Sequence, residues 1–429
     1  MSSRRGIGFW EASAIGVGGM VGGGIFAVLG LAVELAGGGV PLAFAVAGAV
    51  ALLTSYSYAR LSVTFPSEGG TVHFLVKAFG SGLFSGGLNI LLWLSYVIML
   101  ALYASAFGSY GASFFSGATQ TAVKHILISV IVIAVTGLNL MAAEVIGKAE
   151  DWIVGLKLAI LLVFIGVGVW SIEAGRLAVS TWTPALRLLS GGMIIFVAYE
   201  GFELIANTAK DVRDPERTLP RAFYVSVSFV VALYVTIALV TAGNLSLSAI
   251  ASAKDYALAE AARPFLGQAG FALIAVAALL STTSAINATL YGAGRLTYTI
   301  ARDGQLPREL ERKVWRRPIE GLLITSALTL VAANFLDLSS ISTTGSAGFL
   351  LIFAAVNLAA IRLSRKTGGR RWVSAAGLAG CVAALVAILL EVGRAAPLRL
   401  LVLAAMLAVS FGGEAVYRRM RKGTYAGAE

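Results

Sequence analysis

The chain has 429 residues, of which 58% are hydrophobic and only 13% are charged, and its mean hydropathy is +0.85. This composition excludes a soluble globular protein. The net charge of +11 admits a polyanionic partner at first sight, whereas the single cysteine, Cys381, excludes an internal disulfide.

Apolar segments long enough to cross about 30 Å of hydrocarbon recur along the whole chain. They predict an all-α integral membrane protein with twelve transmembrane helices. In chain order the segments are 8–36, 40–64, 82–112, 124–143, 149–171, 188–209, 221–244, 268–300, 319–335, 339–361, 373–391 and 397–417.

Two of these segments are interrupted, and they occupy corresponding places if the first ten are divided into two blocks of five. In the first, IGVGGMVGGGIF (15–26), half of the residues are glycine, which favours an unwound stretch. In the sixth, SGGMIIFVAYEGFE (190–203), Glu200, Gly201 and Glu203 interrupt an apolar run. A simpler interpretation of the first segment is close helix packing through a GxxxG pattern at Gly18 and Gly22.

A matched pair of interruptions predicts the binding site of a transporter at the interface of inverted repeats. The second half of a broken helix begins with unpaired N–H groups, which suit a carboxylate. The first half ends in free carbonyls, which suit an ammonium or a sodium ion. An α-amino acid carries both charges and therefore fits both ends.

The fifth segment contains a lysine, Lys157, among apolar residues. A charged group at that depth costs about 2.5–3.5 kcal/mol on insertion scales and usually marks an ion or substrate pathway. The alternative is that Lys157 extends to an interface, because its segment follows Glu150 and Asp151.

Basic residues are unevenly distributed between the segments on the two sides of the predicted membrane. With the N-terminus inside, most of the 33 lysines and arginines fall on cytoplasmic segments, such as those within 210–221, 302–317, 362–371 and 418–422. This is the positive-inside distribution, with both termini cytoplasmic in the plasma membrane. The positive net charge is therefore explained by membrane topology. We expect the lipid bilayer, and not nucleic acid, to be the partner of the basic residues.

Several motifs in this order resemble the amino acid–polyamine–organocation (APC) transporters. They are FWEASAIGVGGMVGGGIF (9–26), FPSEGGTVHFLVKAFG (65–80), FVAYEGFE (196–203), AKDVRDPERTLPRA (209–222), STTSAINATLYGAGRLTYTIARDGQLPREL (281–310) and ERKVWRRPIEG (311–321). The nearest likeness within the family is to proton-coupled, sodium-independent archaeal transporters of broad amino acid specificity, which have a lysine in helix 5 at the matching place.

The resemblance implies a LeuT-like fold in one polytopic domain, residues 1–429. It has two inverted five-helix repeats, 8–171 and 188–361, with discontinuous helices 1 and 6, and two peripheral helices within 373–417. It also implies alternating access.

The resemblance further implies the site. The substrate site comprises both helix breaks: Val17, Gly22, Gly23, Gly24, Ile25, Phe196, Val197, Ala198, Tyr199 and Glu200. The coupling group Lys157 replaces a sodium ion, with partners at Gly18 and Ser284 and with Ser281 and Thr283 nearby. Glu203 and Phe202 are implied in gating.

Glu200 departs from the family pattern, which has an apolar residue at this place. An extra carboxylate beside the site favours a cationic substrate, or is neutral in a dry pocket, or turns toward the outer vestibule and hydrates it.

These observations predict a secondary transporter that imports amino acids by alternating access, driven by the proton gradient. A sodium symporter, an amino acid or polyamine exchanger, and a sensor on the same fold are the alternatives. We expect no enzyme, no cofactor and no metal site, because the chain has two histidines, both at segment ends, and one cysteine. Neither the oligomeric state nor the particular amino acid follows from the sequence.

Overall fold

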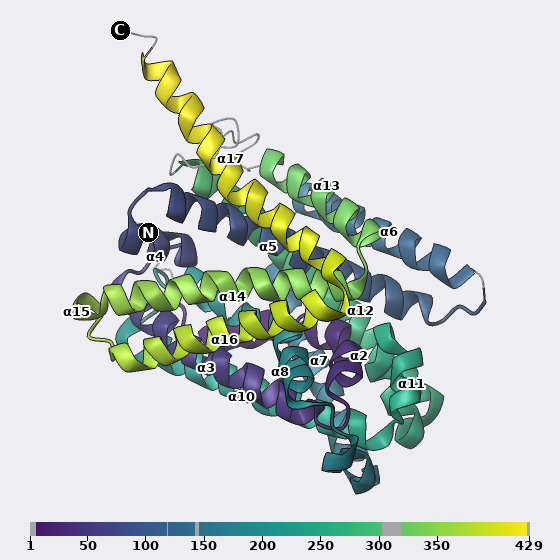
Figure 1. Cartoon of the computed structure of the whole chain (residues 1–429). Coiled ribbons are helices and arrows are strands. Elements are labelled where there is room, and N and C mark those ends of the chain that lie inside the picture. The colour runs from purple at the N-terminus through teal and green to yellow at the C-terminus, as the bar shows by residue number, and fades with distance from the viewer. Residues whose placement is uncertain (1–5, 118, 142–145, 303–318, 427–429) are drawn as a thin grey trace.

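The computed structural model describes residues 6–117, 119–141, 146–302 and 319–426, and in these ranges the chain is helical, with two isolated bridges in place of any sheet (Figure 1). The basic N-terminal residues Arg4 and Arg5 and most of the predicted cytoplasmic link 302–317 lie outside the described residues. The predicted all-α fold is confirmed for the part described.

The principal helices follow the predicted segments. Their bounds are α1 Phe9–Met20, α2 Gly24–Ala36, α3 Val40–Thr64, α4 Gly70–Phe79, α5 Leu83–Ala112, α6 Thr119–Met141, α7 Ile146–Gly168, α8 Ala185–Ile194, α9 Leu204–Asn207, α10 Pro215–Asn244, α11 Leu247–Ser252, α12 Ala257–Arg302, α13 Ile319–Phe335, α14 Leu338–Arg362, α15 Ser364–Thr367, α16 Arg371–Ala395 and α17 Leu400–Ala426. Short 3₁₀ turns connect them, among them η4 Phe196–Glu203 and η5 Lys254–Tyr256.

Ten spans in the described ranges are long and apolar enough to cross a membrane, and α1 with α2 forms an eleventh, bent by 47°. The ninth predicted segment corresponds to α13, which has 17 described residues and follows directly on an undescribed stretch. The count of twelve spans therefore remains a prediction.

Both predicted interruptions are present. The first span breaks between Met20 and Gly24. The second is not an open coil: α8 gives way to η4, an eight-residue 3₁₀ helix, before the chain returns to α-helix at α9. A 3₁₀ helix keeps most backbone groups hydrogen-bonded, which explains why this stretch stays ordered among apolar neighbours.

The two breaks lie together at the centre of the bundle. The α1 helix packs on α10 and η4, and η4 also contacts α3 and α14. On the other side α5 packs against α6, α12, α14 and α17. Helices α14 and α16 run side by side, whereas α17 extends beyond the other helices toward the C-terminus (Figure 1).

A short lid covers the predicted outer end of α2. It consists of α11, η5 and the first part of α12, which is separated from the rest of α12 at Gly267, where φ is +62°. Lys254 of the lid pairs with Glu34 of α2 at 2.6 Å, and the backbone of the lid crosses so near Gly30 that a methyl group there would overlap the Lys254 carbonyl. The lid therefore packs directly on this end of α2.

A buried polar cluster connects α3, α14 and α16. The Asn357 side chain accepts a hydrogen bond from Ser57 at 2.7 Å and donates to Thr54 at 3.1 Å, and Ser57 also donates to Ser374 at 2.9 Å. Because the partners come from three helices, the cluster holds α16 against α3 and α14.

Replacing Asn357 with alanine is expected to lower the free energy of unfolding by about 1–3 kcal/mol, since it removes the buried acceptor of Ser57 and the buried donor to Thr54. Thermal unfolding of the purified protein in detergent measures the effect. Thr236→Ala, which removes a partly exposed hydroxyl that donates to the Ala232 carbonyl within α10, is the matched control. Equal stability of the two variants would contradict a structural role for the cluster.

Candidate functional site

The first break presents a row of unpaired amide groups. Among the described residues, no acceptor receives the backbone N–H of Gly22, Gly23, Gly24 or Ile25, and the first amide of α2 with an acceptor is that of Ala27, which donates to Gly23. These amides also stand at the positive end of the α2 dipole. The arrangement suits a carboxylate.

The carbonyls that end α1 and begin the break face hydroxyl groups from other helices. Ser281 of α12 donates to the carbonyls of Val21, at 3.1 Å, and Gly22, at 2.8 Å. Tyr234 of α10 donates to the Met20 carbonyl at 2.6 Å. The Val17 carbonyl accepts from the Val21 amide, so it completes the last turn of α1.

The second break is held from α14. Ser346 accepts the Val197 amide at 3.0 Å and donates to the Ile194 carbonyl, to which Ser342 also donates. Phe196 packs its ring against Phe353. The serines of α14 thus replace helical hydrogen bonds that the 3₁₀ turn gives up.

Two expected wall residues of the site have other contacts. The Tyr199 hydroxyl donates to the Phe44 carbonyl of α3 at 3.0 Å, and its ring packs against Tyr234. Ala198 lies against Gly24, where an added methyl group would come within 2.9 Å of the Ala198 Cα. The two breaks are therefore in direct contact.

The backbones approach most closely at Gly19 and Gly201. A methyl group on Gly201 would overlap the backbone of Gly19 and Met20. Glycine is required here by space, because only a residue without Cβ allows the two broken helices to touch.

Lys157 is 1% exposed and projects from α7 toward α1, where its ammonium lies 3.3 Å from the Gly18 carbonyl. Of the three hydroxyl residues expected near it, Ser281 bonds to the first break and Thr283 donates to Leu279 within α12. Ser284, in the same helix, is also buried. The lysine thus joins α7 to the first half of the broken helix.

Glu203 accepts hydrogen bonds from three hydroxyls. Tyr58 and Thr71 each donate to one carboxylate oxygen at 3.1 Å, and Tyr96 donates to the other. Phe202 beside it packs on Tyr58. This cluster joins η4 to α3, α4 and α5, and it contains Glu203, one of the two residues expected in gating.

Tyr58 and Thr71 are site residues that the sequence did not indicate, because they lie 145 and 132 residues from Glu203. A weak signal existed for Tyr96 and Tyr103, which are seven residues apart and therefore lie on one face of α5. Tyr103 contacts the first break, where a methyl group on Gly22 would come within 3.5 Å of its hydroxyl.

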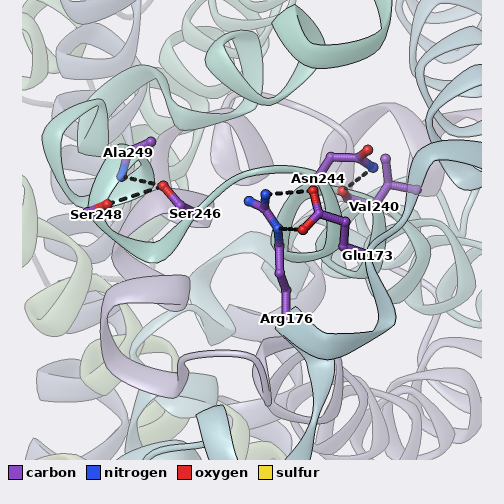
Figure 2. A network of polar contacts seen from close by, with 7 residues as sticks. All are labelled: Glu173, Arg176, Val240, Asn244, Ser246, Ser248 and Ala249. Atoms are coloured by element: carbon purple, nitrogen blue, oxygen red, sulfur yellow. Dashed lines mark hydrogen bonds and ion pairs between the residues drawn. The ribbon is translucent and has the colours of Figure 1, made fainter.

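A separate crevice of about 460 Å³ lies at the periphery, between the 3₁₀ turns after α7 and the link from α10 to α11. Figure 2 shows its polar side chains, with Arg176 forming two hydrogen bonds to Glu173 at 2.7 and 2.8 Å. These bonds lower the pKa of Glu173. The crevice shares no residue with the two breaks, and we assign no transport role to it.

Replacing Tyr234 with phenylalanine is expected to reduce substrate uptake about tenfold. The hydroxyl contacts the Met20 carbonyl at 2.6 Å and the Ala198 carbonyl at 3.5 Å, so its loss leaves a buried acceptor unpaired and loosens both breaks. Initial rates of uptake into proteoliposomes measure the effect, with the exposed Tyr291→Phe as control. Wild-type rates in Tyr234→Phe would contradict this role.

Comparison with known proteins supports a transporter. The sequence matches the amino acid permease family over residues 7–413. It is 38% identical over 363 residues to an uncharacterised protein of Methanocaldococcus jannaschii, covering 84% of this chain and 83% of the relative. It is 37% identical over 358 residues to the inner membrane transport protein YbaT of Escherichia coli, covering 83% of each.

A solved structure, that of a mutant of the Eremococcus coleocola manganese transporter, superimposes with a TM-score of 0.64 at 14% identity and covers 96% of both chains. At this identity the match shows the fold alone, and it confirms the LeuT-like architecture. By the sequence match over 7–413 and the two relatives above 30% identity, the chain belongs to the amino acid permease family of the APC superfamily of membrane transporters.

Proposed function

We propose that this transporter imports amino acids by alternating access, driven by the proton gradient, with Lys157 as the coupling group. The observation that carries the proposal is the buried ammonium of Lys157 at 3.3 Å from the Gly18 carbonyl. Gly18 belongs to the half of the broken helix that precedes the substrate site.

A fixed ammonium satisfies oxygen ligands as a sodium ion does, and it differs in that it can release a proton. With the proton bound, Lys157 holds α1 against α7. Without it, the charge that attracts the Gly18 carbonyl is lost, and α1 is free to move. Protonation thus biases the equilibrium between two conformations, which is the requirement for coupling.

The substrate site follows from the two breaks. The free amides of Gly22, Gly23, Gly24 and Ile25 receive the substrate carboxylate. The substrate amino group faces carbonyls at the end of α1, near Val17, and in η4 at 196–199. Glu203 with its three hydroxyl donors, and the neighbouring Phe202, form the inner gate.

The chain is organised as two repeats followed by two peripheral helices. The inverted repeats comprise 8–171 and 188–361, and the peripheral helices lie within 373–417. The plasma membrane with both termini in the cytoplasm agrees with the distribution of basic residues. The partners are a small-molecule amino acid, protons and lipid.

Uptake of a mixture of labelled amino acids into sodium-free proteoliposomes tests the proposal. Accumulation with an inward proton gradient, and none without it, is the expected result. Uptake that requires sodium indicates a sodium symporter. Uptake only into vesicles preloaded with amino acid indicates an exchanger. Binding without flux indicates a sensor.

A further inference from the structure

Glu200 is a buried carboxylate with an unfilled hydrogen-bonding requirement. It is 4% exposed, and among the described residues no group donates a hydrogen bond to its Oε2. Glu203, three residues later, is fully provided with donors. The two carboxylates of one short helix therefore differ: one is part of a complete protein network, and the other is not.

The position of Glu200 follows from the 3₁₀ geometry of η4. Residues three apart lie above one another in a 3₁₀ helix, so Glu200 and Glu203 share a face. Glu203 bonds to Tyr96 of α5. Glu200 therefore points to the same side of η4 as Glu203, toward α5.

Tyr103 of α5 adjoins the free amides of the first break, because its ring lies against Gly23. Ala198 of η4 lies against Gly24, so the segment that carries Glu200 adjoins the amide row directly. One end of this region suits an anion, and the other end presents an acceptor that lacks a donor.

A buried carboxylate oxygen without a hydrogen-bond donor is costly, and a second carboxylate, Glu203, lies three residues along the same 3₁₀ helix. A second negative charge nearby increases the need for a cation. Glu200 is buried, so bulk water has little access to it in the present conformation.

We infer that Glu200 selects amino acids with a basic side chain, by pairing with the side-chain ammonium or guanidinium while the amides of the first break hold the α-carboxylate. The three or four methylenes of such a side chain separate its two charged ends and pack on the apolar wall between them. This inference deepens the proposed function and rests on it.

The experiment compares lysine with norleucine, which has an uncharged side chain of similar length. Uptake of each labelled amino acid into proteoliposomes is measured for the wild type, Glu200→Gln and Glu200→Asp. Wild type is expected to prefer lysine, and Glu200→Gln to reduce the ratio of lysine to norleucine uptake by about tenfold to a hundredfold, as for loss of one charge-assisted hydrogen bond. Glu200→Asp, which keeps the charge, is expected to recover part of the preference.

Glu414→Gln is the matched control, because Glu414 is a buried carboxylate of α17 that pairs with Arg418 at 2.6 Å, away from both breaks. Its lysine preference is expected to equal that of the wild type. Thermal stabilisation of the detergent-purified wild type by lysine but not by norleucine provides a readout that needs no flux and no variant.

Uptake of norleucine but not lysine by the wild type would overturn the inference and leave the proposed function intact. An unchanged lysine preference in Glu200→Gln would also overturn it. Absence of uptake of every amino acid would remove the proposed function and the inference together.

Discussion

Lys157→Ala is expected to abolish accumulation of amino acid against a gradient. The substitution removes the ammonium that holds the Gly18 carbonyl, and with it the group whose protonation biases the conformational equilibrium. Loss of a charge-assisted hydrogen bond costs about 1.5–3 kcal/mol, so gradient-driven uptake should fall roughly tenfold to a hundredfold. Uptake into sodium-free proteoliposomes with an imposed proton gradient measures this.

Two controls separate coupling from damage to the fold. Lys157→Gln retains a hydrogen-bond donor without a titratable proton, so it should bind substrate and exchange it across the membrane without accumulating it. Gly155→Ala alters the same helix at an exposed position with open space around the added methyl group, and it should behave as wild type. If Lys157→Ala accumulates substrate with the pH profile of the wild type, the coupling role is wrong.

Gly201→Val is expected to reduce transport about tenfold to a hundredfold. Its Cβ would overlap the backbone of Gly19 and Met20, and backbone cannot turn aside as a flexible side chain does. The two broken helices must then separate, which displaces the free amides of the first break from the second. Overpacking of this kind typically costs about 1–3 kcal/mol.

Initial rates of uptake, together with a size-exclusion profile of the purified protein, test this expectation. Gly137→Ala in α6, where the added methyl group meets no atom within 4 Å, is the control and should retain wild-type rates. Wild-type transport by Gly201→Val would show that contact between the two breaks is not needed.

Hydropathy and glycine content were sufficient to predict the class of the protein and the positions of the two breaks. Both properties are local: a span needs a continuous apolar segment, and an unwound stretch needs residues that do not favour helix. Lys157 was also evident from the sequence, because a charge within an apolar segment is visible without knowledge of its neighbours. The 3₁₀ form of the second break was not, since it depends on Ser342 and Ser346 of α14.

The sequence by itself therefore determined that the chain is a helical membrane protein with two interrupted spans and a charged residue in a third. Only the tertiary structure decided which side chains complete the site. Tyr234 reaches Met20 across 214 residues, Tyr96 reaches Glu203 across 107, and the Oε2 atom of Glu200 receives no donor among the described residues. Such contacts depend on how helices far apart in the sequence pack against each other. A local pattern of residues does not predict this packing.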